Sequence, residues 1–217
     1  MKERAQIIIL NTTAFGDKSL ILHCISDLWG RRSFIVSRSS KTAAVVYRPM
    51  NILDCEVTIN PKSDLWRVSA VTLKHPLASI QSSMEKTALC MFMSEVLYRT
   101  VREPAQDDGV LFSWCEQNIL TLEALQSDFA NFHIMFLLGL SSALGFAPTK
   151  EALAPFMGGD YALAGDFLTL PAAQAMLLPM SGNRRTELCR NIIKYLEHHT
   201  ESRIDIKSLD VLHQVFV

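Results

Sequence analysis

The stretch FGDKSLILHCISDLWGRRSFIVSRSSK, residues 15–41, contains two short runs of apolar residues separated by a turn signal. Within it, residues 19–26 alternate between two faces, and residues 32–38 form a second short run of apolar side chains with basic residues at both ends. The segment between the runs, residues 28–30, ends in a glycine, which tolerates the backbone angles of a tight turn. Two such runs joined by a turn predict an antiparallel hairpin.

Three further strand signals accompany this hairpin, at residues 6–10, 52–60 and 65–73. Glycine, proline, asparagine and aspartate occupy the segments between the runs, which is typical of turns. Five strands within about 75 residues suit a small closed β-barrel, so we expect an all-β domain over residues 1–76.

Helical spacing replaces the strand pattern after Pro76. The spacing predicts one long helix over residues 77–102, whose centre is apolar nearly all round. It predicts further helices over residues 107–125, 128–145, 184–199 and 207–216. The fold class is therefore α+β, with a helical bundle domain over residues 77–217. The most apolar window, residues 132–146, is shorter than the about 20 residues of a membrane span and predicts a buried helix, not a membrane contact.

Charge is distributed unevenly along the chain, although the formal net charge is only −1. Residues 1–76 hold 11 Lys and Arg against 6 Asp and Glu, whereas residues 77–217 hold 10 against 16. A basic segment of this kind indicates binding to a polyanion, and two differently solvated surfaces are the alternative interpretation.

The chemistry of the sequence gives little support to catalysis. The chain contains none of the nucleophile-elbow, phosphate-loop or zinc-protease motifs, and we expect no cofactor and no metal. The 5 cysteines form no C-x-x-C pair and fit core positions, so a reduced, cytoplasmic protein is expected.

Four segments, in their order and spacing, resemble the RecO family of bacterial recombination mediators. They are residues 15–41, RPMNILDCEV at 48–57, LLGLSSALGFAP at 137–148 and IKSLDVLHQVF at 206–216, and together they cover most of the chain. The resemblance implies that the N-terminal barrel is of the OB type. It also implies a bacterial, nucleoid-associated protein that binds DNA.

The sequence departs from the family pattern in two places. Many family members carry a four-cysteine zinc module near residues 155–170, but no Cys or His lies between His133 and Cys189, which excludes a zinc site there. We expect a small glycine-containing turn insertion in its place. The family's glycine after the third strand is replaced by residues 37–39, Ser-Arg-Ser, which keep the positive charge.

OB-type barrels bind oligonucleotides across the second and third strands and the adjoining loops, using cations for phosphates and aromatic rings for bases. The candidate nucleic-acid-binding residues are Lys18, Arg31, Arg32, Arg38, Lys41, Tyr47, Arg48, Lys62, Trp66 and Arg67. Phe15 is expected to plug the barrel. Any one of these cations could equally be an ordinary solvated side chain, so the prediction depends on the whole set.

The resemblance further implies a mediator role without catalysis. Such proteins bind single- and double-stranded DNA, anneal strands coated by single-strand-binding protein and, with RecR, help load RecA. The family's helical domain receives the acidic C-terminal tail of single-strand-binding protein, and the candidate residues are Arg99, Arg102, Arg184, Arg185 and Arg190. Ordinary helix-surface cations are the alternative for these five. A non-enzymatic helical adaptor carried by an OB-type barrel remains the rival function.

Overall fold

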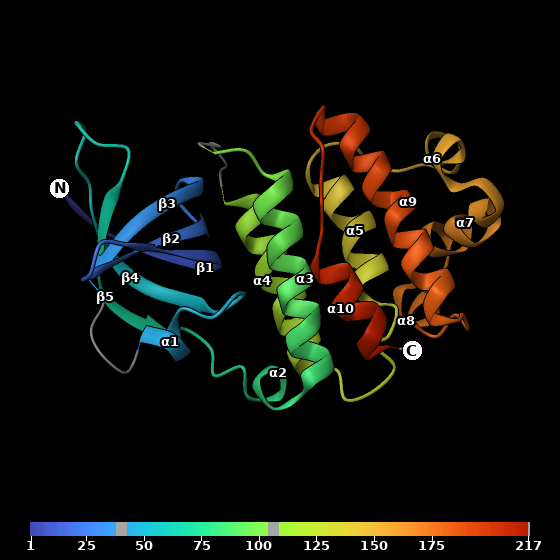
Figure 1. Ribbon diagram of the computed structural model, residues 1–217, viewed down its shortest axis with the longest axis horizontal. Coiled ribbons are helices and arrows are strands. Elements are labelled where there is room, and N and C mark those ends of the chain that lie inside the picture. The colour runs from blue at the N-terminus through green and yellow to red at the C-terminus, as the bar shows by residue number, and fades with distance from the viewer. Residues whose placement is uncertain (38–42, 104–108, 217) are drawn as a thin grey trace. The chain divides into compact units, whose positions relative to one another are not determined.

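The computed structural model describes residues 1–37, 43–103 and 109–216 (Figure 1). The chain divides into two compact units. The first, called the barrel unit here, comprises Met1–Ala78 and Leu97–Ile119, and the second, called the helical unit, comprises Ser79–Val96 and Leu120–Val217.

Five strands of the described chain form the closed barrel that the sequence predicts. They are β1 (Lys2–Phe15), β2 (Ser19–Ser26), β3 (Gly30–Ser37), β4 (Ile52–Thr58) and β5 (Trp66–Leu73), and a short helix, α1 (Ala43–Val46), lies between β3 and β4. Their neighbour order is β1-β2-β3-β5-β4, and of the pairings only β3–β5 is parallel. The prediction of an N-terminal five-stranded barrel followed by helices is confirmed.

Strand β1 is much longer than the expected residues 6–10 because it pairs with two neighbours in succession. Its first half, residues 2–8, pairs with β4, and residues 7–15 pair with β2, with a register shift between Ile9 and Asn11. Residues 11–15 are exposed, so they carry no hydrophobic signal by which a strand is recognised.

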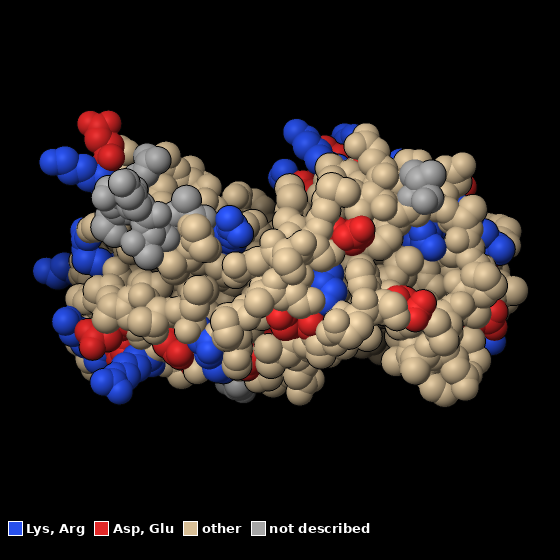
Figure 2. All heavy atoms as spheres, turned by 90° about the horizontal axis from the view of Figure 1, so that it is seen from below, with Lys and Arg blue, Asp and Glu red and all other residues tan. Residues whose placement is uncertain are grey.

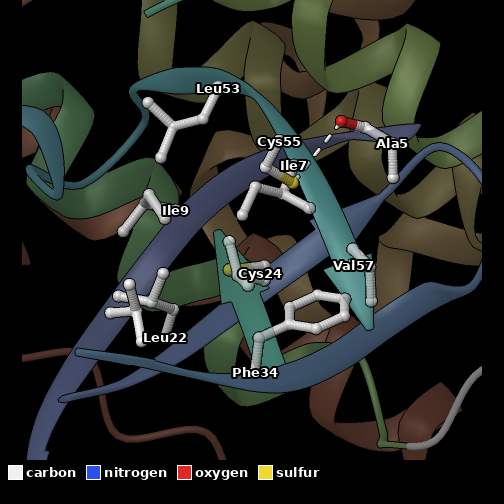
Figure 3. Close-up of a cluster of buried hydrophobic side chains, with 11 residues drawn as sticks. Ala5, Ile7, Ile9, Leu22, Cys24, Phe34, Leu53, Cys55 and Val57 are labelled. Carbon is white, nitrogen blue, oxygen red and sulfur yellow. Dashed lines mark hydrogen bonds between the residues drawn. The ribbon is translucent and has the colours of Figure 1, made fainter. Parts of the chain in front are cut away.

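Alternate residues of the strands fill the barrel interior (Figure 3). Ile7, Leu22, Phe34, Leu53 and Val57 are fully buried there. Cys24 and Cys55 lie in the same core, and burial raises the pKa of the Cys55 thiol to about 12. The prediction that the cysteines fill the core is confirmed, because all five thiols are free and buried.

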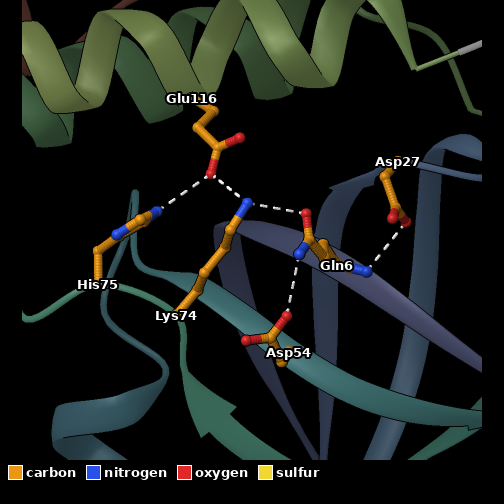
Figure 4. Close-up of polar contacts among 6 residues, drawn as sticks. All are labelled: Gln6, Asp27, Asp54, Lys74, His75 and Glu116. Carbon is orange, nitrogen blue, oxygen red and sulfur yellow. Dashed lines mark hydrogen bonds and ion pairs between the residues drawn. The ribbon is translucent and has the colours of Figure 1, made fainter.

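The barrel unit also includes the C-terminal end of α3 (Met84–Thr100) and most of α4 (Val110–Ala124). Lys74 Nζ donates to Gln6 Oε1 at 2.9 Å and to Glu116 Oε1 at 2.6 Å, so this ammonium group ties α4 to β1 (Figure 4). Gly109 precedes α4 with φ of +79°, and a Cβ there would lie 2.9 Å from the carbonyl oxygen of Asp27. Only glycine suits both the backbone angle and this close approach.

The expected single helix over residues 77–102 is broken at Ser83 into α2 (Ala78–Ser82) and α3. Ser83 Oγ accepts a hydrogen bond from the backbone N–H of Lys86 and so caps the start of α3. The Glu123 carboxylate accepts from the N–H groups of Ser79 and Ile80, each at 2.8 Å, at the start of α2. Serine is more favourable at a cap than inside a helix, which accounts for the break at the consecutive serines 82 and 83.

The rest of the helical unit contains α5 (Phe132–Ala143), α6 (Lys150–Met157), η1 (Gly158–Asp160), α7 (Tyr161–Thr169), α8 (Ala172–Met176), α9 (Gly182–Thr200) and α10 (Ser208–Val215). The expected helices at residues 128–145, 184–199 and 207–216 are present as α5, α9 and α10, and the segment between α5 and α9 differs from the prediction. Residues 155–170, expected as a glycine-containing turn, are mostly helical because Leu153, Met157, Ala164 and Phe167 are buried at helical spacing. Of the helices described, none has both the length and the hydropathy needed to cross a membrane.

His133 lies in the core of the helical unit with only 2% of its surface exposed. Its ring stacks on Phe216 and meets Phe92 edge-on. Burial lowers the pKa of His133 to about 3, and the positive charge of Arg185 acts in the same direction. His133 is therefore neutral in the folded protein near pH 7.

We expect Phe34→Ala to destabilise the barrel by about 3–5 kcal/mol, because it removes a fully buried ring from a packed interior. Urea unfolding followed by tryptophan fluorescence measures this, since the Trp29 ring lies 6.1 Å from the Phe34 ring. The control is Ile35→Ala, at the neighbouring position on the opposite face, for which we expect a loss of about 1 kcal/mol. Equal losses for the two variants would contradict the described alternation.

We expect the helical unit to lose stability on acidification through His133. The unfolded chain binds a proton at this site below about pH 6.5, whereas the folded chain does so only near pH 3, so stability falls as the pH drops between these values. The contribution is about 2 kcal/mol at pH 5 relative to pH 7. Urea unfolding of wild type and His133→Phe, followed by circular dichroism at both pH values, measures it, and parallel pH profiles would rule it out.

Candidate nucleic-acid interface

The two successive arginines of β3 point to opposite sides of the barrel wall, because side chains alternate along a strand. Arg32 shares the inward side with Phe34, and Arg31 shares the outward side with Ser33. From the sequence we predict that Arg31 and Arg32 act together, but in the structure their guanidinium groups lie on opposite sides of the barrel wall.

Arg31 does not lie at the surface, since only 3% of it is exposed. Its Nη1 lies 3.3 Å from Glu103 Oε2 and donates to the carbonyl of Cys24, and its guanidinium lies 5.0 Å from the centre of the Tyr98 ring. Burial lowers the pKa of Arg31, and the Glu103 carboxylate opposes that shift. A carboxylate distant in sequence therefore neutralises this cation.

Arg32 packs on one of two tryptophans that contact the barrel core. Its guanidinium carbon lies 3.4 Å from the centre of the Trp66 ring, which is a close cation–π contact. Trp66 meets Trp29 edge-on at 5.2 Å and donates from Nε1 to the carbonyl of Asn60. Arg32 thus covers one face of Trp66, so that face is not open to a nucleic-acid base.

Lys62 adds positive charge beside Arg32. It is exposed in the turn between β4 and β5. Asp64, in the same turn, accepts a hydrogen bond at its carbonyl oxygen from Arg32 Nη2 at 3.2 Å. The turn carrying Lys62 therefore lies beside the beginning of β3.

Arg67 and Lys18 continue the positive charge along β3 toward its other end. The exposed Arg67 donates from Nη1 to Ser37 Oγ at 3.2 Å. Ser37 pairs with Ser19, and the exposed Lys18 directly precedes Ser19. We call the set Lys18, Lys62 and Arg67 the β3 track.

The residues of the β3 track lie beside β3 along most of its length. From Arg32 to Ser37 the strand rises by about 17 Å, at about 3.3 Å per residue. No side chain of the track forms an ion pair with a carboxylate in the part of the chain that the structure describes. Figure 2 shows Lys and Arg side chains on the barrel unit with fewer Asp and Glu among them.

The remaining sequence candidates in the barrel unit have different environments. Arg48 is exposed next to the segment that hydrogen-bonds β1 through Met50, two strands away from β3. Tyr47 is half-buried against the barrel core, which raises the pKa of its hydroxyl group. Arg38 and Lys41 lie outside the described residues.

Phe15 does not plug the barrel as expected. Its side chain is 53% exposed at the end of β1, beside the turn that carries Lys18. Residues 11–15 of β1 are all exposed, so Phe15 lies on the part of the strand that does not pack on the barrel core. An exposed ring beside a cation is a candidate for stacking on a base.

Sequence reasoning missed a polar chain on the outer face of β1, β2 and β3. Thr13 Oγ1 lies 3.1 Å from His23 Nε2, and His23 Nδ1 lies 2.8 Å from Ser33 Oγ. Ser33 donates in turn to Glu103 Oε2 at 2.9 Å. Burial, followed by the charge of Arg31, lowers the pKa of His23. No local pattern connects Glu103 to these strands, because 70 residues separate it from Ser33.

The five candidate partner-binding arginines also differ in their surroundings. Arg184 and Arg190 are exposed and form ion pairs with Asp160 at 2.8 Å and Asp210 at 3.4 Å. Arg185 is buried and donates to Asn131, to the carbonyl of Phe216 and to that of Met180. Arg99 and Arg102 are exposed and belong to the barrel unit.

A hollow of about 720 Å³ lies in the helical unit. Apolar side chains of Leu125, Phe129, Val215 and Phe216 line it together with the cations Lys86 and Arg185. Lys86 Nζ donates to Ser79 Oγ and to the carbonyls of Glu123 and Leu125, so it caps the end of α4. Glu85 and Asp128 add negative charge to the same lining.

Comparison with known proteins identifies relatives along the whole chain. Residues 81–154 match the family described as "Recombination protein O C terminal". The chain is 30% identical over 241 residues to "DNA repair protein RecO" of Phocaeicola vulgatus and 29% identical over 242 residues to that of Bacteroides fragilis. It is 25% identical over 239 residues to the protein of the same name from Flavobacterium psychrophilum.

Each of these three comparisons covers 100% of this chain and 100% of the relative. The match therefore includes both the closed barrel and the helices that follow it. The chain belongs to the RecO family of DNA repair proteins.

Proposed function

We propose that this protein is a recombination mediator that binds single- and double-stranded DNA without sequence preference. The observation that carries the proposal is the β3 track, whose three exposed cations follow one strand of a five-stranded barrel and have no carboxylate partner among the described residues. Cations placed in this way contact phosphates, which every nucleotide carries, and so provide affinity without reading bases.

Annealing follows from the same charge arrangement. Two complementary strands repel each other through their phosphates, and a protein that neutralises part of that charge lowers the barrier to pairing. No covalent step is needed, so the function is not enzymatic. We place the protein in the bacterial cytoplasm at the nucleoid, where its DNA substrate is found.

The family to which the chain belongs suggests its partners. We propose that it acts with RecR, receives DNA coated by single-strand-binding protein and so assists the loading of RecA. The exposed arginines Arg184 and Arg190 are the best-placed contacts for the acidic tail of single-strand-binding protein, because solvent-exposed ion pairs are weak and exchange readily. Arg185 is needed inside the helical unit and is left out of this contact.

The second candidate, a helical adaptor whose barrel is only a carrier, is favoured by two observations. Glu103 neutralises Arg31 within the barrel unit, and the helical residues carry an excess of negative charge. An adaptor of this kind would bind proteins and show no dependence on the β3 track.

We expect the double substitution Lys62→Ala/Arg67→Ala to weaken binding of a fluorescein-labelled single-stranded oligonucleotide at least about tenfold at about 50 mM salt, since two phosphate contacts are lost. Fluorescence anisotropy measures the affinity. The control is Lys194→Ala/Arg203→Ala, which removes the same charge from exposed positions of the helical unit. Equal affinities for the two double variants would favour the adaptor.

We expect Arg184→Ala/Arg190→Ala to weaken binding to single-strand-binding protein several-fold, because both guanidinium groups would contact the acidic tail. A pull-down with intact single-strand-binding protein and with a version lacking the tail measures this. Lys194→Ala, on the same helix, is the control. Retention of binding by the arginine variant, or by the tail-less partner, would place the contact elsewhere.

A further inference from the structure

The outer face of β2 and β3 carries a set of hydrogen-bond donors that converge on one point. That point is Glu103 Oε2, which accepts from Ser33 Oγ at 2.9 Å and lies 3.3 Å from Arg31 Nη1. All three residues belong to the barrel unit. An oxygen of negative charge held by an arginine and a hydroxyl is also the arrangement in which proteins hold a phosphate oxygen.

The donors are fixed before any ligand arrives. Ser33 has one hydroxyl proton and gives it to Glu103, so His23 must donate from Nδ1 to Ser33 Oγ and accept at Nε2 from Thr13. The Tyr98 ring packs against both Arg31 and His23. The hydroxyl and the guanidinium are therefore held in place by a histidine and an aromatic ring.

Glu103 satisfies Arg31 incompletely. Arg31 is 3% exposed, yet its Nε has no hydrogen-bond partner among the described residues. Guanidinium groups bind carboxylates and phosphates best through two parallel N–H donors, and a buried donor without a partner costs free energy. Arg31 therefore keeps a buried donor that Glu103 does not satisfy.

Within this cluster, the Glu103 carboxylate is the group that a phosphate from solution can displace, because it is the more exposed partner of Arg31. Its side chain is 34% exposed, whereas that of Arg31 is 4% exposed. A phosphodiester group carries the same single negative charge as the carboxylate, so an exchange would keep the charge of Arg31 balanced.

We propose that Arg31 and Ser33 form a phosphate subsite for single-stranded DNA that the carboxylate of Glu103 occupies in the free protein. DNA binds at this subsite by displacing the carboxylate, so Glu103 acts as an internal competitor that limits affinity. This inference rests on the proposed DNA-binding function and adds a second contact area to the β3 track, on the same strand.

The test compares Glu103→Gln with Glu56→Gln by fluorescence anisotropy on a labelled single-stranded oligonucleotide at about 50 mM salt. The two carboxylates are closely matched: each forms one ion pair in the barrel unit, and their side chains are 34% and 37% exposed. Both substitutions change the net charge equally. We expect Glu103→Gln to bind about threefold or more tightly than Glu56→Gln, because only the former weakens a competitor at the subsite.

The same comparison is repeated in two backgrounds, Arg31→Met and Ser33→Ala. A thermal melt checks that each background variant is folded, and two backgrounds are used so that one remains if the other does not fold. The gain from Glu103→Gln should shrink in either background, because the subsite has lost a donor. Equal affinities of Glu103→Gln and Glu56→Gln, or an undiminished gain in a folded background, would overturn the subsite. Absence of DNA binding by wild type and both variants would instead overturn the proposed function.

Discussion

Side-chain alternation along β3 is the constraint on which the basic character of the barrel depends. Because neighbouring residues of a strand face opposite sides, the closed barrel places Arg32 against Trp66 and turns Arg31 outward onto Tyr98 and Glu103. Neither guanidinium is a free surface charge. The cations left for a ligand come from positions that this constraint does not bury, namely turns and outward positions near the strand ends.

This arrangement divides the positive charge of the barrel unit into two kinds. The β3 track is solvated and without carboxylate partners among the described residues, so it can attract a polyanion from solution. Arg31 is desolvated and paired, which makes it a strong contact only for a ligand that replaces its carboxylate.

The sequence predicts those elements of the fold that depend on neighbouring residues, and it does not predict those that depend on contacts between residues far apart along the chain. The alternation of residues 19–26 predicts β2 correctly because it follows a buried face, whereas the exposed half of β1 has no such pattern. The cap at the start of α2 comes from Glu123, which lies some 40 residues later, so local sequence does not predict it. The same holds for the candidate site. The sequence identifies the cations, but it does not identify the carboxylates that pair with Arg31, Arg184 and Arg190, because these are distant along the chain.

In the proposed function, solvated cations of the barrel hold the sugar-phosphate backbone of DNA. The salt dependence of the single-strand affinity of the wild-type protein tests this contact, because each phosphate contact releases counterions. Three contacts from the β3 track predict that the logarithm of the association constant falls with the logarithm of salt concentration with a slope of about −2 or steeper. A slope near zero would contradict the account, whatever the affinity.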